Sequence, residues 1–151
     1  TAMPISGTGH IIATNTGATK EAGEPDHAGD PGGASLWFRW TAAEDGFLSV
    51  DTILTDFDTT LAVYTGATLE TLVEVASNND TLGQGSRVQD ISVLTGDVYY
   101  IAVDGIDGAT GQFDFNWIAF TGPTFAEITP VSDPLWNTDA QHDFVLMEDD
   151  N

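Results

Sequence analysis

The chain has 151 residues, and its 24 Asp and Glu outnumber its three Lys and Arg, for a formal net charge of −21. This charge argues against nucleic acid and anionic membrane surfaces as partners, because both are bound through clustered Lys and Arg. Self-repulsion of this size has to be screened by salt or neutralised by bound cations, which favours a saline extracellular setting and calcium. The absence of cysteine excludes disulfides and thiolate metal sites, and no apolar run approaches the roughly twenty residues of a membrane span.

Short runs that alternate apolar and polar side chains follow one another as far as residue 120, separated by Gly, Asn and Asp. Strands with one buried face have this period of two. The runs predict strands over residues 10–13, 35–41, 46–52, 60–65, 72–77, 87–93, 98–104 and 112–120.

Three of these predictions depend on local detail. Residues 42–46 (AAEDG) predict a hairpin connection that Gly46 closes. The imperfect alternation of residues 87–93 predicts a β-bulge. Residues 69–75 would fit a helical turn, but their β-branched side chains favour a strand.

Seven or eight short strands with no convincing helical period predict an all-β fold. We expect a two-sheet antiparallel β-sandwich, jelly-roll-like, over residues 1–121. In its last strand, Phe113, Phe115 and Trp117 fall on one face, and Gln112, Asp114 and Asn116 fall on the other. Residues 122–151 are expected to form a C-terminal extension outside the sandwich.

The extension is interrupted by three prolines before it reaches an apolar run of Phe144, Val145, Leu146 and Met147. An apolar strand without a sheet of its own folds back onto a free edge or adds to a neighbour's edge. Pairing with its own sandwich, insertion into the next copy of the chain to build a filament, and a linker to a further module all stay open.

An acidic loop, residues 21–34, leads into the most aromatic of the predicted strands. Its prolines and glycines exclude a helix. Its carboxylates are Glu21, Glu24, Asp26 and Asp30. Several carboxylate and carbonyl oxygens on a turn-rich loop suit calcium, and a solvated acidic loop is the alternative.

Four segments together resemble the bacterial pre-peptidase C-terminal domain: ATKEAGEPDHAGDPGGASLWFRWTA (residues 18–42), DFDTTLAVYTG (56–66), the SNND loop with SRV after it, and YYIAVDGIDGATG (99–111). The resemblance covers roughly residues 5–118. It implies a secreted, non-catalytic β-sandwich of the kind found beside proteases and in long surface proteins. The family's collagenase members bind collagen and are stiffened by calcium.

Several acidic residues match positions of that family. The resemblance implies that Glu21 and Glu24 are calcium ligands and that loop residues Asp80 and Asp104 complete the site. The full set of expected ligands is Glu21, Glu24, Asp26, Asp80, Asp104 and Asp107. Asp58 matches the aspartate before the family's Thr-x-Leu strand, and we expect its carboxylate to accept backbone amides at a turn.

No catalytic centre is expected. Ser35 and Ser86 do not lie in a Gly-x-Ser-x-Gly elbow. His27 beside Asp26 and Asp30 would suit a metal or acid–base group, but a histidine that hydrogen-bonds within its loop is favoured.

Exposed aromatic rings are a second kind of candidate site, because they stack on sugar rings beside hydrogen-bonding side chains. Trp37 and Trp40 cannot both face inward on a regular strand, so one is expected on an outer face or beneath a loop. We select Trp37 and Trp136 as candidate binding residues.

We therefore expect an extracellular or cell-surface, calcium-stabilised sandwich without catalytic activity. Its expected role is structural or adhesive, in contact with copies of itself or with neighbouring surface-protein modules. The alternative is a module that targets a secreted hydrolase to a polysaccharide or protein polymer.

Overall fold

The computed structural model describes residues 1–81 and 83–122. These residues form nine strands and two single 3-10 turns: β1 (Met3–Ile5), β2 (Gly9–Thr14), β3 (Leu36–Thr41), β4 (Gly46–Asp51), β5 (Thr59–Thr65), η1 (Leu69–Thr71), β6 (Val73–Asn78), β7 (Arg87–Val93), β8 (Val98–Gly105), η2 (Ile106–Gly108) and β9 (Gln112–Phe120). All eight predicted strands are present, each within one residue of its predicted ends. β1 and η1 were not predicted as separate elements.

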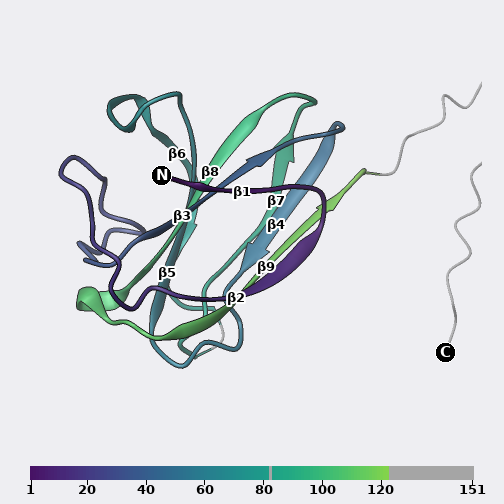
Figure 1. Cartoon of the computed structure of the whole chain (residues 1–151). Coiled ribbons are helices and arrows are strands. Elements are labelled where there is room, and N and C mark those ends of the chain that lie inside the picture. The colour runs from purple at the N-terminus through teal and green to yellow at the C-terminus, as the bar shows by residue number, and fades with distance from the viewer. Residues whose placement is uncertain (82, 123–151) are drawn as a thin grey trace, which may run out of the picture.

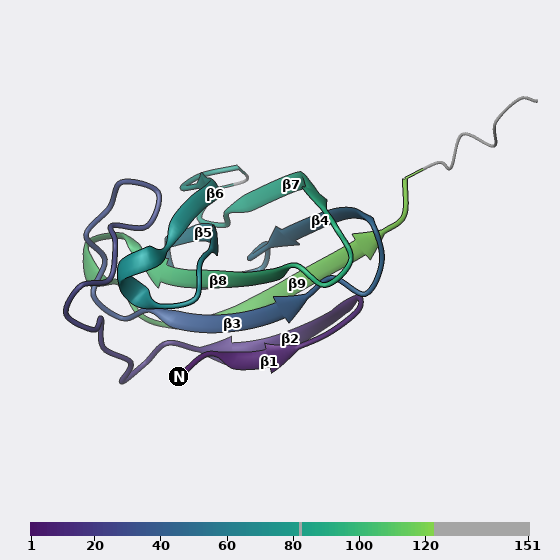
Figure 2. The same ribbon diagram turned by 90° about the horizontal axis from the view of Figure 1, so that it is seen from above.

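Two sheets pack face to face, which confirms the all-β sandwich (Figures 1 and 2). The five-stranded sheet has the order β1-β3-β8-β5-β6, and the four-stranded sheet has the order β2-β9-β4-β7. All neighbouring strands are antiparallel except β1 and β3, which are parallel. In the described residues no helix is long and apolar enough to cross a membrane.

The connection over residues 42–45 differs from the predicted hairpin. β3 pairs with β8 in one sheet, whereas β4 pairs with β7 and β9 in the other. The connection therefore crosses between sheets. The turn residues of a short loop are compatible with both outcomes, and the partners of the two strands decide between them.

The predicted bulge in β7 is confirmed. Val88 lies opposite Val50 and Ile91 opposite Leu48, so two β7 residues face the single residue between those β4 partners. Asp90, one of the two, has a positive φ of 57°. An extra residue in one strand breaks the alternation that the sequence displays.

Aromatic rings fill the space between the sheets. Phe38 and Phe115 stack across it with ring centroids 4.3 Å apart, and Phe115 also packs on Trp117. The indole N–H groups of Trp40 and Trp117 donate to the carbonyls of Gly7 and Ser6 respectively. These two bonds fix the β1–β2 turn to the edge of the core.

A smaller cluster lies on the outer face of the five-stranded sheet. Ala62, Tyr64 and Ala102 are buried there, with Trp37, Leu72 and Tyr100 packed against them. The acidic loop lies beside β3 and η2, at the left of Figure 1. Apolar side chains on the outer face of a sheet are stabilised when another segment shields them from water. The acidic loop does this here, and the candidate site lies between the loop and the sheet.

Candidate binding groove

Trp37 faces away from the sandwich core. It belongs to the same strand as Phe38 and Trp40, which are 1% and 2% exposed in the core, and alternation turns Trp37 to the opposite face. The sequence predicted that one of these two tryptophans faces outward. The structure shows that this residue is Trp37, whereas Trp40 lies in the core.

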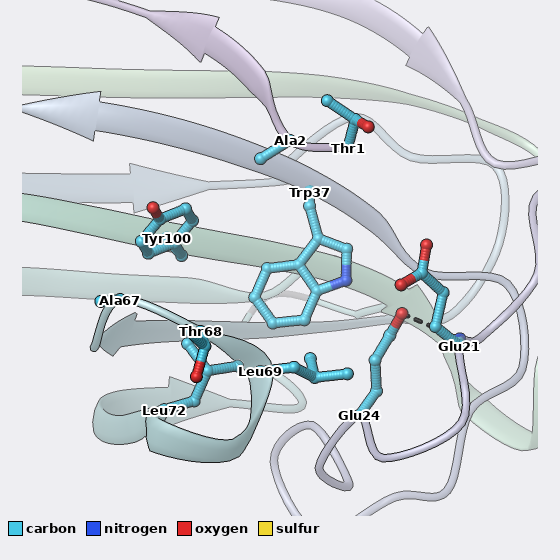
Figure 3. A pocket seen from close by; sticks show the side chains of 10 residues that line it. All are labelled: Thr1, Ala2, Glu21, Glu24, Trp37, Ala67, Thr68, Leu69, Leu72 and Tyr100. Carbon is cyan, nitrogen blue, oxygen red and sulfur yellow. Dashed lines mark hydrogen bonds between the residues drawn. The ribbon is translucent and has the colours of Figure 1, made fainter.

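A hollow of about 170 Å³ opens against the Trp37 ring (Figure 3). Tyr100, Leu69 and Leu72 lie on one side of the indole, and Glu21 and Glu24 lie beyond its other side. A second hollow of about 220 Å³ shares Thr1, Glu21, Glu24 and Trp37 in its wall. We call the first of these hollows the Trp37 groove; its wall consists of Thr1, Ala2, Glu21, Glu24, Trp37, Ala67, Thr68, Leu69, Leu72 and Tyr100.

Glu24 holds the acidic loop against β3. Its Oε1 accepts the backbone N–H of Glu21 at 2.9 Å, and its Oε2 accepts the Ser35 hydroxyl at 2.5 Å. Burial acts to raise the pKa of this carboxyl, but these bonds and the nearby Trp37 indole outweigh it and hold the pKa below its usual value. Glu24 is therefore a buried anion, with only 3% of its side chain exposed.

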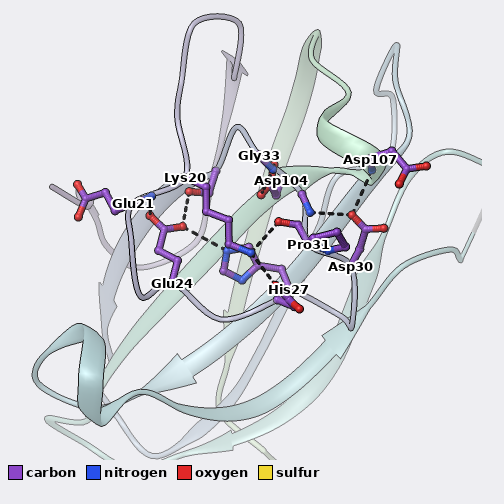
Figure 4. Close-up of polar contacts among 12 residues, drawn as sticks. Lys20, Glu21, Glu24, His27, Asp30, Pro31, Gly33, Asp104 and Asp107 are labelled. Carbon is purple, nitrogen blue, oxygen red and sulfur yellow. Dashed lines mark hydrogen bonds and ion pairs between the residues drawn. The ribbon is translucent and has the colours of Figure 1, made fainter.

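His27 is fully buried beneath the loop, where Figure 4 shows it beside Glu24. Its Nδ1 lies 2.8 Å from the Tyr64 hydroxyl, and its Nε2 lies 3.6 Å from Oε2 of Glu24. Burial lowers the pKa of His27, although the negative charges of Asp104 and Glu24 act in the opposite direction. The ring is neutral near pH 7. The sequence predicted a hydrogen bond within the loop, but the hydrogen-bond partner of His27 is Tyr64 of β5.

Asp104 anchors the C-terminal end of the loop. Its carboxylate is fully buried and accepts the backbone N–H groups of Gly33 at 3.0 Å, Ala34 at 2.9 Å and Gly105 at 2.8 Å. Gly32 has a φ of +54°, and a Cβ there would lie 2.0 Å from Oδ2 of Asp104. Only glycine fits this close approach of the loop to β8.

Two further contacts complete the attachment of the loop (Figure 4). Oδ1 of Asp30 accepts the backbone N–H of Gly32 at 2.8 Å and that of Asp107 at 3.1 Å, which ties the loop to η2. Lys20 Nζ donates to Asp26 at 3.0 Å and to the Pro31 carbonyl at 2.7 Å. The Trp37 groove therefore has one wall made by a loop that is bonded at several points.

Asp58, directly before β5, and Asp80, shortly after β6, form a separate acidic pair. Burial, and then the negative charge of Asp80, raise the pKa of Asp58. Oδ1 of Asp58 and Oδ1 of Asn79 are buried and have no hydrogen-bond partner among residues 1–81 and 83–122. The expectation that the Asp58 carboxylate accepts turn amides is not met there, since the bond from Ile106 N–H goes to the Asp58 backbone carbonyl.

Comparison with known proteins bears on the fold. No family model matches the sequence, and no curated protein matches it. The pre-peptidase C-terminal domain of a collagenase from Bacillus anthracis superposes with a TM-score of 0.50 over 80% of this chain and 95% of that chain, at 11% identity. This chain has the pre-peptidase C-terminal fold. The resemblance found in the sequence is thus confirmed as a likeness of fold.

Within this pre-peptidase C-terminal fold, the six predicted calcium ligands do not gather at one point. Glu21 and Glu24 adjoin the groove, Asp26 pairs with Lys20, and Asp104 is surrounded by backbone amides. Asp80 lies beside Asp58, and Asp107 lies in η2. In the described part of the chain, no three His, Asp or Glu side chains are grouped so as to hold a metal ion.

Of the predicted binding residues, Trp37 lies in the groove, and Trp136 and the run 144–147 lie outside the described residues. Sequence reasoning missed Tyr100, Leu69 and Leu72. Tyr100 could have been found from the alternation of β8, in which Tyr99 is 4% exposed and its neighbour faces outward. Leu69 lies in η1 and Leu72 directly follows it, whereas the sequence favoured a strand over a helical turn for residues 69–75.

Proposed function

We propose that this chain is a non-catalytic, extracellular binding module that holds its parent protein on a polymer, and that the Trp37 groove is its binding surface. The observation that carries the proposal is an aromatic ring turned out of the sandwich into a hollow whose other wall is acidic. Aromatic faces beside polar groups are typical of surfaces that bind polymers by stacking. A solved structure of the same fold belongs to a collagenase, which supports a module attached to a secreted hydrolase.

The polar groups of the groove support binding more than catalysis. Glu24 is held by Ser35 and by the Glu21 amide, and neutral His27 is covered and paired with Tyr64. A catalytic acid or base has to reach the proton that it transfers, and these two groups are enclosed by their own protein partners.

Retention on insoluble polymers tests the proposal. Collagen fibrils, chitin and cellulose are incubated with the full chain, with Trp37→Ala and with Phe120→Ala as a control that removes an exposed aromatic ring from the other sheet. We expect at least one polymer to retain the wild type and the Phe120 variant but to release the Trp37 variant about tenfold more readily. The proposal is contradicted if no polymer retains the wild type, or if the Trp37→Ala variant is retained as well as the wild type.

A structural role in an assembly is a second proposal, favoured by β6. This strand is an edge of the five-stranded sheet, and its Val73 and Val75 are 62% and 44% exposed. An edge strand with apolar side chains is a template for strand addition. We propose that residues 144–147 of another copy pair with the free edge of β6. Size-exclusion chromatography of the full chain and of residues 1–122 tests this proposal. Two monomers of equal thermal stability contradict it.

We also propose that calcium stabilises the fold by binding between Asp58 and Asp80. The support is the pair of like charges, with buried oxygens of Asp58 and Asn79 that lack partners in the described residues. Calcium takes carboxylate and amide oxygens together with waters. Calcium bound only to the folded state adds about 2.7 kcal/mol to stability at a hundredfold excess over its Kd.

Thermal unfolding in chelator and in millimolar calcium tests the calcium proposal. Calcium should raise the melting temperature of the wild type and of the surface control Asp90→Asn, but not that of Asp80→Asn. In chelator Asp80→Asn should be the more stable protein, because it removes the charge that opposes ionisation of Asp58. No calcium shift in the wild type removes the proposal, and an undiminished shift in the Asp80 variant removes the site.

A further inference from the structure

The walls of the Trp37 groove differ in chemistry from one end to the other. Leu69 and Leu72 give an aliphatic side, Trp37 and Tyr100 give aromatic rings, and Glu21 gives a carboxylate at the far end (Figure 3). A flexible hydrocarbon chain with a cationic head is complementary to this order of surfaces. Long basic side chains cover apolar surface with their methylenes and keep the charged head at a polar site.

We propose that the groove binds a basic side chain, such as lysine, of a polypeptide partner. The inference rests on the proposed function, because it names what the groove of the binding module takes. The cation is recognised by the Trp37 ring face and the Glu21 carboxylate together, since an aromatic face attracts a cation within about 6 Å of its centre.

Size supports one side chain as the occupant. The hollow measures about 170 Å³, whereas sites for drug-sized ligands measure about 300–1,000 Å³. An apolar cavity of about 150 Å³ holds a molecule as large as benzene. The groove therefore has room for the end of one side chain, with the rest of the partner outside.

Charge supports a cation. The protein has three Lys and Arg for a net charge of −21. Lys20 is bonded to Asp26 and the Pro31 carbonyl, Arg87 pairs with Asp51, and Arg39 lies opposite Tyr100 in the β3–β8 register but outside the groove wall. His27 is neutral. A hollow in so acidic a surface concentrates cations.

The hydrogen-bonding groups of the groove support a cation over a neutral sugar. Both Glu24 oxygens accept bonds from the protein, and the Thr68 hydroxyl lies 3.2 Å from that of Thr71. Sugar rings need several free donors and acceptors around their hydroxyls, whereas a cation needs one carboxylate and a ring face. Glu21 is that carboxylate, since in the described residues its side chain makes no hydrogen bond or ion pair.

Titration of the full 15N-labelled chain with two isosteric peptides tests the inference. One is Ac-Gly-Lys-Gly-NH2 and the other carries norleucine, which keeps the hydrocarbon chain and lacks the charge. We expect the lysine peptide to shift the Trp37 indole and the amides of residues 69–72, with an affinity about three- to tenfold higher than that of the norleucine peptide. Raised salt should reduce the difference.

Two variants assign the charge effect. Glu21→Gln leaves the loop bonds in place, because Glu21 contributes its backbone and not its carboxylate to them. It should remove most of the affinity difference between the lysine and norleucine peptides, while Glu44→Gln, which removes an equal charge outside the groove, should not. Equal affinities for the two peptides, or equal losses in the two variants, overturn the inference.

The same titration separates this inference from the proposed function. Shifts at Trp37 with a neutral oligosaccharide such as cellohexaose, but none with the lysine peptide, overturn the basic-side-chain inference and keep the groove as a binding surface. If the lysine peptide shifts nothing and polymer retention also ignores Trp37, both fail.

Discussion

Asp104 shows how one buried carboxylate can be balanced by backbone alone. Its two oxygens face amides of residues 33, 34 and 105, which are donors from the loop and from its own strand. A carboxylate that accepts several backbone N–H bonds is stable as an anion without a cationic partner. Asp104 was predicted to be a calcium ligand, and in the structure its two carboxylate oxygens accept hydrogen bonds from backbone amides of the chain.

Removing this carboxylate should loosen the loop. Asp104→Ala leaves buried amide donors without acceptors, and we expect a loss of about 3 kcal/mol in unfolding free energy and about 10 °C in melting temperature. Asp104→Asn keeps one acceptor oxygen and should lose about half as much. Asp90→Asn, an exposed position with a positive φ that Asn tolerates, is the matched control in calorimetry. A loss in Asp104→Ala no larger than in the control would contradict this account.

His27 makes stability depend on pH. Because burial lowers its pKa in the folded state, the unfolded chain takes up a proton first as the pH falls below about 6.5. The contribution of His27 to stability should therefore be lost as the pH falls below about 6.5, with a slope of up to about 1.4 kcal/mol per pH unit. The lowered pKa of Glu24 acts below this window.

Denaturant unfolding between pH 5 and 7 measures this slope. In His27→Gln the contribution is absent, so the variant should show a flatter profile even if it is less stable at pH 7. If His27→Gln keeps the wild-type slope, groups other than His27 cause the pH dependence of stability.

At the scale of elements, β3 and the acidic loop act together. β3 contributes Phe38 to the core, Trp37 to the groove and Thr41 to the end of the sheet, while the loop before it returns to cover the outer face. Glu24 joins the two elements, since Ser35 and Trp37 are its neighbours. Removal of this buried anion, one of several attachments of the loop, should therefore let the loop open locally more often.

We expect Glu24→Ala to increase the rate of amide hydrogen exchange in residues 21–34 by about tenfold, while the amides of β5 and β8 keep their protection. Glu44→Ala, in the 42–45 connection, is the control for a lost carboxylate. Faster exchange throughout the sandwich would instead mean that Glu24 supports the whole fold.

At the scale of the molecule, the chain carries 24 acidic and only three basic side chains. Self-repulsion opposes the compact state, and salt reduces it as the screening length falls from about 30 Å at 0.01 M to about 3 Å at 1 M. The melting temperature should therefore rise by several degrees over this range of NaCl. Potassium chloride gives the control, because it screens charge to the same extent, so a rise common to both salts reports screening and not one specific cation site. A flat or falling curve in both salts would contradict a repulsion-limited stability.

The sequence alone determined the strands and their faces. Alternation located Phe113, Phe115 and Trp117 on the buried face of β9, and it required Trp37 and Trp40 to point in opposite directions. Such periods are local, because successive side chains of a strand alternate wherever the strand lies. The fold likeness also followed from segments spread over most of the chain.

Tertiary structure decided which strands and which acids meet. Residues 42–45 connect two sheets instead of a hairpin, and β1 joins β3 in parallel, because pairing depends on strands distant in sequence. Asp104 meets loop amides 70 residues away, and Asp80 meets Asp58, whereas sequence alone placed them in one cation site. The sequence shows where an acidic residue stands in the chain. Which group it contacts depends on the packing that brings distant segments together.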